Sequence, residues 1–389
     1  MRRPATTSAR AATLLLLGAG LAGSATAGSL PTACSGVACG AELVPPRADA
    51  SPPQEALDAE QITVWPLDLE LAGKNDEELF AIGQAAYAGG ELDRAAAAFG
   101  RVADLHPASR HHATALFDAG LALLRLERWP AARERFDALT RRYEGPDAVE
   151  AAFKAAECLY HQGALPEAWR RLEALAARPL APADRVRALG QRGVVELELG
   201  RLEAAEASLR LAVSIWRQAE AAERLDVRDA AQAQFHLGEV YRAHFLAVKL
   251  DPSVEGEEKL SRDLEDKASL LLSAQGHYLR TIRMNDPDWA VAAGARIGEL
   301  YDDLHGALLE APLPPGLDAE EADAYRLALR QRVRVLVAKA IATYEQTLAA
   351  AGRARVEENA FVAKAQASLD RMKQSLRDLP PEPAPAPAP

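Results

Sequence analysis

Histidine has the widest choice of chemistry among the residues of this chain, since it can ligate a metal or transfer a proton. The eight histidines never show the His-Glu-x-x-His spacing that puts two ligands on one helical face. His111 and His112 are adjacent and would point roughly 100° apart on a helix. His236 and His244 are eight residues apart and could share a face. We expect a structural pair there rather than a metal site.

Other catalytic signatures are also missing from the sequence. Gly89-Gly90 comes nearest to a glycine-rich phosphate loop, but it is expected to end a helix. No serine or cysteine has the surroundings of a nucleophile elbow. The sequence therefore predicts no catalytic residue, no cofactor and no metal site, in a protein that is not an enzyme.

The cysteines suggest two fates for the N-terminal region. Cys158 falls on an otherwise apolar face of a predicted helix, where we expect it to be a small buried hydrophobic residue. Cys34 and Cys39 lie close together, and an oxidising compartment would let them form a disulfide. Alternatively, Leu30-Pro31-Thr32-Ala33-Cys34 resembles a bacterial lipobox, in which the cysteine becomes lipidated. Lipidation and pairing of Cys34 both stay open.

The first 27 residues have the features of an export signal. Arg2, Arg3 and Arg10 accompany an apolar run from Ala11 to about Gly23, and Ala25-Thr26-Ala27 offers small residues for cleavage. The apolar run is shorter than the ~20 residues that cross a bilayer. We predict a signal peptide, with a membrane anchor or a disordered tail as the alternatives. Export would place the protein in the periplasm or attach it to the outer membrane as a lipoprotein.

Composition points to helices and away from nucleic acid. Alanine and leucine dominate the 389 residues, only 5% are aromatic, and the formal net charge is −11. Such an acidic chain is not expected to bind nucleic acid non-specifically. Residues 28–75 and 378–389 are rich in proline and alanine, and we predict a disordered linker and a disordered tail.

The strongest pattern is an internal repeat. Small residues stand at Gly83, Gly120, Ala156 and Gly193, which are 36 or 37 residues apart. Twelve residues after each of these marks stands an alanine, and sixteen residues after it a large apolar residue. The pairs are Ala95 and Phe99, Ala132 and Phe136, Ala168 and Leu172, and Ala205 and Leu209.

These offsets predict a helical hairpin. A small mark lets two helices approach closely, and the later alanine and large residue lie one turn apart on the second helix, facing the first. Seven residues after the mark, Gly90, Gly163 and Gly200 are expected to end the first helix in the left-handed conformation. The second unit has Glu127 at that place.

The pattern resembles the tetratricopeptide repeat, a helix–turn–helix unit that stacks into a right-handed superhelix. The resemblance covers residues 76–218 as four regular units. It implies an all-α superhelical array of about six units, built to bind other proteins. The first three units, with Asp104-Leu105-His106-Pro107, are similar to bacterial periplasmic repeat proteins. The stretch from Asp286-Pro287-Asp288-Trp289 to Ala351 is similar to gliding-motility lipoproteins of the deltaproteobacterial envelope.

Residues 219–377 are predicted to form two expanded units and a capping helix. Gly238 and Gly298 mark the first helices, but Tyr278 and Tyr344 follow later than the regular spacing requires. We expect the extra length in loops, which are tolerated insertions or part of a binding face. The loops would be the acidic segment 251–266 and the proline-rich residues 312–316, with a helix start at Asp318, a partner helix at 335–351 and a capping helix at about 356–376.

In the repeat family, the first helices line a concave groove, at positions three before and one or four after the mark. The alternative is that the phenylalanines at these positions pack between helices as core. The predicted partner-binding residues are Phe80, Gln84, Tyr87, Phe117, Leu121, Leu124, Phe153, Glu157, Tyr160, Phe235 and Glu239.

The sequence thus predicts a non-enzymatic interaction scaffold of the bacterial cell envelope, which holds a segment of a partner in its groove. The partners would be other envelope proteins or peptides, and membrane contact would depend on the N-terminal lipid alone. The alternative is a periplasmic carrier or enzyme accessory that binds a small molecule or a cell-wall glycan. The two hypotheses share the fold and differ in the ligand.

Overall fold

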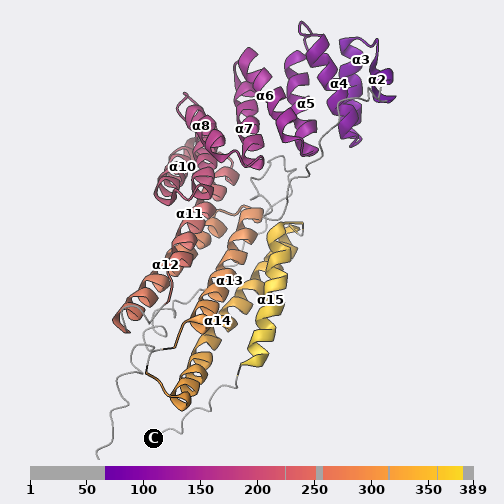
Figure 1. Cartoon of the computed structure of the whole chain (residues 1–389). Helices are drawn as coiled ribbons and strands as arrows, with labels where there is room; N and C mark the ends of the chain where they lie inside the picture. The colour runs from indigo at the N-terminus through magenta and orange to yellow at the C-terminus, as the bar shows by residue number, and fades with distance from the viewer. Residues whose placement is uncertain (1–65, 224, 251–256, 314–315, 357, 380–389) are drawn as a thin grey trace, which may run out of the picture. The chain divides into compact units, whose positions relative to one another are not determined.

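The computed structural model describes residues 66–223, 225–250, 257–313, 316–356 and 358–379. Every regular element within these residues is an α-helix, which confirms the predicted all-helical repeat array (Figure 1). Contacts divide the chain into two compact units, an N-terminal unit that ends at Ser208 and a C-terminal unit that begins at Leu209. The predicted signal peptide, Cys34 and Cys39 lie outside the described residues.

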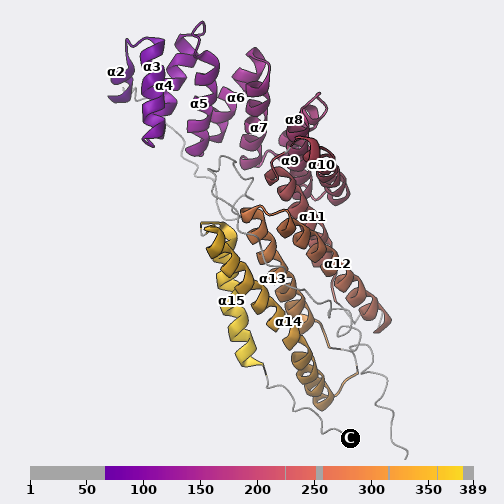
Figure 2. The same cartoon turned by 180° about the vertical axis from the view of Figure 1, so that it is seen from behind.

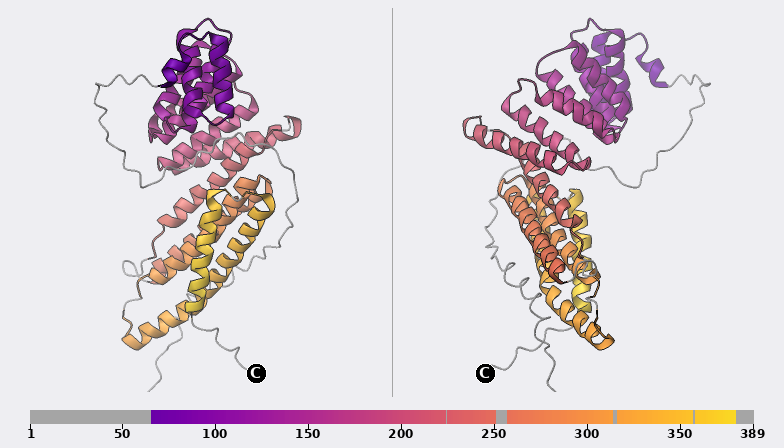
Figure 3. Two further views of the ribbon diagram at one scale, coloured as in Figure 1. Left: turned by 90° about the vertical axis from the view of Figure 1, so that its right-hand side faces the viewer. Right: turned by 60° about the vertical axis from the view of Figure 1, so that its left-hand side comes forward.

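The N-terminal unit consists of helical hairpins, coloured indigo to magenta in Figure 3. From α3 to α9 each helix packs against the next one along the chain. The last helix, α10, continues past Ser208 into the C-terminal unit. The helices are α2 (Pro66–Leu71), α3 (Asp76–Ala88), α4 (Leu92–Leu105), α5 (His112–Arg125), α6 (Trp129–Arg142), α7 (Pro146–His161), α8 (Leu165–Ala176), α9 (Pro182–Glu198) and α10 (Leu202–Glu223).

The short helix α2 lies inside the range 28–75, for which the sequence predicted no folded structure. Leu71 at its end is only 1% exposed and packs into the first hairpin's core. Glu70 forms an ion pair with Arg94 of α4. Folded structure is therefore present before the first repeat, within the segment whose composition predicted none.

The predicted left-handed helix ends are confirmed. The φ angles of Gly90, Gly163 and Gly200 are 78°, 71° and 71°. Glu127 adopts the same conformation, with φ of 58°, although a side chain disfavours it. Its N–H donates to the carbonyl of Leu124 at 2.9 Å, the same three-residue spacing that Gly163 uses. All four regular turns thus share one backbone shape.

Glycine at the mark positions is explained by the second helix of the hairpin. A Cβ added at Gly83 would lie 2.6 Å from the ring of Phe99, and one added at Gly120 would lie 2.6 Å from the ring of Phe136. Both rings are almost fully buried. The aromatic residue therefore fills the space that the missing side chain leaves, and this contact sets how closely the two helices approach.

The C-terminal unit contains two longer hairpins and a last helix. Each helix from α11 onward packs against the next, and α15 also contacts α13. Figures 1 and 2 show α13, α14 and α15 running side by side. The helices are α11 (Arg228–Ala247), α12 (Glu257–Arg283), α13 (Pro287–Glu310), α14 (Ala319–Ala354) and α15 (Ala360–Asp378).

The extra length of these hairpins is helical, which corrects the prediction of loops. Residues 257–266 of the predicted acidic loop belong to α12, which has 27 residues. The predicted partner helix at 335–351 begins sixteen residues earlier, because α14 is continuous over 36 residues from its capping residue Asp318. The predicted proline-rich residues 312–316 fall between the end of α13 at Glu310 and the start of α14 at Ala319.

The expanded hairpins keep the contact between a glycine and a ring. A Cβ added at Gly238 would meet Tyr278, and one at Gly298 would meet Tyr344, even more closely than in the regular repeats. Both tyrosines are completely buried. The long hairpins therefore share this glycine–ring contact with the short repeats. We call it the base contact, and the helices of the long hairpins extend beyond it. The last helix, α15, starts at the cap Asn359, whose side chain accepts from the N–H of Phe361 at 2.9 Å.

Candidate partner-binding groove

The first helices of the N-terminal unit present one common face away from their second helices. Positions six and two before the mark, and one and five after it, lie roughly 100–160° around the helix from the mark. We name these residues the groove stripe. They are Glu77, Ala81, Gln84 and Ala88 on α3; Thr114, Asp118, Leu121 and Arg125 on α5; Glu150, Lys154, Glu157 and His161 on α7; and Arg187, Gln191, Val194 and Glu198 on α9.

Burial of the groove stripe increases along the array. All four of its residues on α3 are exposed, and those on α5 are exposed or half-buried. On α7, Lys154 and Glu157 are buried, and on α9, Gln191 and Val194 are buried. The most accessible part of the groove stripe therefore lies on α3 and α5.

The predicted aromatic ladder is mostly core. Phe80 is 8% exposed and stacks on His111, with ring centroids 4.2 Å apart. Phe153 is fully buried, and the guanidinium of Arg187 lies 4.3 Å from its ring centroid. Phe235 is buried in the C-terminal unit. The reason is geometric, since a residue three before the mark lies only about 60° from it and so turns toward the second helix.

Five side chains of α3 and α5 form the open surface. Gln84 is exposed, and Tyr87, Leu121 and Leu124 are half-buried. The guanidinium of Arg125 lies 5.2 Å from the ring centroid of Tyr87, so the two helices meet along this face. Phe117, the remaining predicted aromatic, is half-buried beneath it and packs edge-on against the ring of the buried Phe136.

The other predicted residues have structural roles. Glu157 is 3% exposed and accepts a hydrogen bond from the amine of Lys154 at 2.9 Å. Burial raises the pKa of Glu157, and Lys154 opposes this effect. Tyr160 is 1% exposed, and its hydroxyl has no hydrogen-bond partner among the described residues. Glu239 in the C-terminal unit accepts a hydrogen bond from the hydroxyl of Tyr278.

Asp118 is a candidate that the sequence argument missed. It lies on the groove stripe one turn before Leu121, and burial raises the pKa of its carboxyl to about 6. A carboxylate held out of water in this way is stabilised by an incoming cation. The corresponding positions on α3 and α7 are Ala81 and Lys154, so no repeated residue type could have marked this site.

We expect the substitution Asp118→Asn to stabilise the protein near neutral pH. The folded-state pKa of about 6 exceeds the ordinary value of 3.8, so the folded chain holds the proton more tightly than the unfolded chain. This contribution to stability is complete below the unfolded pKa and is lost as pH rises through the folded pKa. Asparagine imitates the protonated form and keeps the contribution.

Urea unfolding of Asp118→Asn and wild type would measure the effect. The variant should gain about 1 kcal/mol at about pH 7.5, after allowance for solvent screening of a half-buried group. The gain should shrink toward zero near pH 4. A variant that is no more stable than wild type at the higher pH would contradict the shifted pKa.

Arginines of the second and third units form ion pairs with aspartates of the preceding unit. Such exposed pairs are individually weak, but here each one connects second helices of successive units. This sequence of cross-links holds α4, α6 and α8 in register behind the groove stripe. The pairs are Arg128 with Asp93 at 2.7 Å, Arg135 with Asp104 at 2.5 Å, and Arg171 with Asp137.

The candidate metal ligands are dispersed. Among the described residues, no three His, Cys, Asp or Glu side chains gather closely enough to hold a metal ion. His236 is buried, and its Nδ1 lies 2.8 Å from the carbonyl of Gln232. Cys158 is fully buried, as predicted, and burial raises its pKa to about 12. No described helix combines the length and the apolar composition that a membrane crossing requires.

The chain was compared with known proteins. Residues 80–134 and 117–169 match the family model of the tetratricopeptide repeat. The apo form of RapI is similar at 12% identity and a TM-score of 0.42, over 76% of this chain and 99% of that one. None of the curated proteins matches the chain.

Two further solved structures have comparable similarity. The C-terminal part of a TPR repeat-containing protein from Cytophaga hutchinsonii is 10% identical, with a TM-score of 0.40 over 78% of this chain and 96% of that one. A tetratricopeptide repeat protein from Parabacteroides merdae is 13% identical, with a TM-score of 0.36 over 77% of this chain and 98% of that one.

The family match and the geometry agree on the same hairpins. The matched residues run from α3 to the start of α8 and include the marks Gly83, Gly120 and Ala156. Arrays of such repeats generally serve as scaffolds for protein interactions, because stacked hairpins create extended concave surfaces. Residues 80–169 of the chain are therefore assigned to tetratricopeptide repeats.

Proposed function

We propose that this protein is a non-enzymatic scaffold of the bacterial cell envelope, and that it binds a segment of a partner protein across α3 and α5. Support for the envelope comes from the export signal in the sequence, which lipidation at Cys34 would extend to membrane attachment. Support for the binding surface comes from the groove stripe, which is most accessible on these two helices.

The single observation that carries the binding proposal is the setting of Asp118. Its carboxyl is poorly hydrated, with a pKa raised to about 6, and it lies one turn from Leu121. A basic side chain of the partner would compensate the buried charge, and a neighbouring apolar side chain would cover Leu121 and Leu124. The fitting partner segment therefore pairs a basic residue with an apolar one.

The proposed binding surface on α3 and α5 is preformed in the absence of a partner. The glycine–ring contacts fix the spacing within each hairpin, and the ion pairs from Asp104 to Arg135 and from Asp137 to Arg171 connect successive second helices. A surface held by its own packing loses little conformational entropy on binding. This favours recognition of an extended or helical segment on a preformed face.

The test is capture from envelope extracts of cells that express the tagged full-length chain. Wild type should retain a specific protein, and the double variant Asp118→Asn/Leu121→Ala should retain about tenfold less, because the proposed basic and apolar contacts are both weakened. Leu105→Ala/Glu134→Gln is the matched control, since it removes an exposed leucine and an exposed carboxylate from the second helices.

The control variant should capture the protein as well as wild type does. Equal losses in both double variants would count against binding at the groove stripe. Recovery of the tagged chain from the cytosol only, with nothing captured from the envelope, would remove the support for the envelope scaffold.

A further inference from the structure

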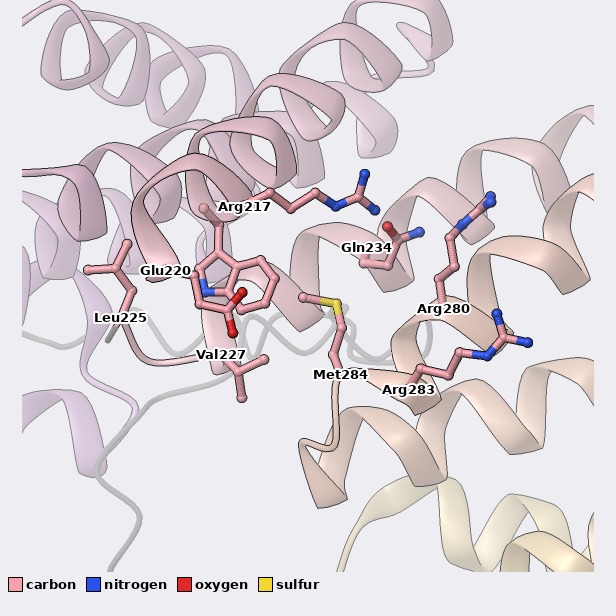
Figure 4. A pocket seen from close by; sticks show the side chains of 9 residues that line it. Arg217, Glu220, Leu225, Val227, Gln234, Arg280, Arg283 and Met284 are labelled. Carbon is pink, nitrogen blue, oxygen red and sulfur yellow. The ribbon is translucent and has the colours of Figure 1, made fainter. Parts of the chain in front are cut away.

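A cavity of about 400 Å³ lies within the C-terminal unit, and it shares no residue with the groove stripe. It is formed by the end of α10, the segment that follows it, the start of α11 and the end of α12 (Figure 4). Leu225, Val227 and Met284 make part of its wall apolar. A volume of this size accepts one large side chain or a small organic group.

Three arginines line the cavity. Arg280 and Arg283 of α12 lie on one side of Met284 in Figure 4, while Glu220 lies on the other with the apolar wall. Arg217 of α10 also lines the cavity. The described side chains offer none of these three guanidinium groups an ion-pair partner.

The arginines around this cavity are close enough to affect one another electrostatically. Burial, and then the like charges of Arg217, Arg210 and Arg283, lower the pKa of Arg280. Arg210 stands nearby, and its guanidinium donates to the hydroxyl of Tyr241 at 2.9 Å. Repulsion of this kind destabilises the protein unless an anion offsets it. The three cavity arginines are exposed and have no ion-pair partner among the described side chains, so they are available to carboxylates of a ligand.

The cavity also holds an unpaired polar group. Trp216 lines it and is 9% exposed, and its indole N–H is buried without a hydrogen-bond partner among the described residues. A buried donor left in this state costs free energy. Gln234 at the same cavity is held in place, because its amide nitrogen lies 2.8 Å from Nδ1 of His277. The site therefore combines cations with an aromatic wall.

A second cavity in this unit lacks these features. It has a volume of about 540 Å³ and is lined by both signs of charge, including Lys267, Asp303 and Glu310. Its Arg371 already pairs with Asp302 at 2.6 Å. Because charges of both signs already compensate one another in this second cavity, it needs no charged ligand. The cavity beside α10 is therefore the stronger candidate.

We propose that the basic cavity binds an acidic segment of a partner protein, with carboxylates on the arginines and one large apolar side chain against Trp216 and Met284. The arrangement of the charges favours a segment over a single small anion. Arg210 and Arg217 are two turns apart on α10, about 10 Å along its axis, and Arg280 and Arg283 stand on another helix. Cations spread in this way match several carboxylates along an extended chain.

Fluorescence anisotropy with labelled peptides would test this site on the full-length chain. The probe is acetyl-Glu-Glu-Leu-Glu-Glu-amide, and the comparison peptide has glutamine in place of every glutamate. The probe should bind with an affinity that falls as salt rises, and the glutamine peptide should bind at least about tenfold more weakly. Replacing the leucine of the probe with alanine should weaken binding as well.

Two protein variants locate the binding. Arg280→Gln/Arg283→Gln should weaken the probe about tenfold or more, since two charge-assisted contacts are lost. Arg330→Gln/Arg377→Gln removes the same charge from exposed positions of α14 and α15, and it should bind the probe as wild type does. Circular dichroism would show that both variants keep their helices.

Three results would overturn the proposal. The first is no binding of the probe up to about 1 mM. The second is an equal loss of affinity in both variants, which would indicate general attraction to the protein surface. The third is displacement of the probe by inorganic phosphate as effectively as by unlabelled peptide, which would assign the cavity to a small anion.

Discussion

The substitution Gly120→Ala is expected to lower the free energy of unfolding by about 2 kcal/mol. The added Cβ would lie 2.6 Å from the fully buried ring of Phe136, closer than such atoms approach in proteins. Overpacking of this kind costs about 1–3 kcal/mol, and the shortest contacts belong at the upper end or beyond. Alanine favours helix over glycine by about 1 kcal/mol, which offsets only part of the strain.

The chain itself suggests the compensating change. The third repeat has Ala156 at the mark and Leu172 at the position of the ring. Phe136→Leu should therefore restore part of the stability that Gly120→Ala removes, with a coupling of about 1 kcal/mol or more in a double-mutant cycle followed by urea unfolding. Independent effects of the two substitutions would contradict the proposed contact.

Gly306 provides the matched control for this experiment. It lies within α13, and an added Cβ would meet nothing within 4 Å. Gly306→Ala should therefore be neutral or stabilising by up to about 1 kcal/mol, through helix propensity alone. If Gly120→Ala and Gly306→Ala shifted stability equally, close approach of the helices would not explain the glycine marks.

The substitution Arg296→Met is expected to cost about 3–5 kcal/mol, the largest effect among these variants. Nε of Arg296 lies 3.0 Å from Glu239, at ion-pair distance though not aligned for a hydrogen bond, and Nη1 lies 2.5 Å from Glu299. Burial would lower the pKa of Arg296, but the two carboxylates raise it above its ordinary value. Removing the guanidinium leaves both carboxylates poorly hydrated and without their shared partner.

Denaturant unfolding of two further variants would test whether uncompensated buried charges cause this loss of stability. Glu239→Gln added to Arg296→Met should recover part of the stability, because one uncompensated charge disappears. Arg326→Met breaks an exposed pair with Asp323, whose atoms are 2.9 Å apart, and should change stability by less than about 0.5 kcal/mol. Similar losses for Arg296→Met and Arg326→Met would refute the role of the buried charges.

The regular repeats could be predicted from sequence because their signal is local. A small residue, an alanine and a large apolar residue at fixed offsets describe one hairpin, so the sequence identified the contact between Gly83 and Phe99. The left-handed turns could also be predicted, because three of the four regular repeats have glycine at that position. Glu127 could be placed at such a turn only by its phase in the repeat, since its residue type opposes the conformation.

The expanded hairpins were harder because acidic residues dominate the start of α12. The acidic segment 251–266 was predicted to be a loop, but Leu264 and Leu271 of α12 lie on a half-buried or buried face, with the buried Lys267 between them. Its amine donates to the carbonyls of Phe245 at 2.8 Å and Val248 at 3.1 Å. The lysine thus satisfies backbone groups near the end of α11, a purpose that only the folded pairing reveals.

The open surface could not be derived from the repeat pattern either. The same phase is exposed at Gln84, half-buried at Leu121 and buried at Glu157. These differences arise from how neighbouring repeats cover one another, which no single repeat encodes. The phenylalanines do recur at one offset, but this offset reflects packing between helices rather than contact with a partner.

The base contact of the long hairpins has a consequence for the order of folding. Phe136 closes on Gly120 across sixteen residues, whereas Tyr278 closes on Gly238 across forty. Loop closure over the longer span costs about 0.8 kcal/mol more entropy, and folding slows as contacting residues become more distant in sequence. We therefore expect the short repeats to form before the long hairpins, because their closing contacts are more local.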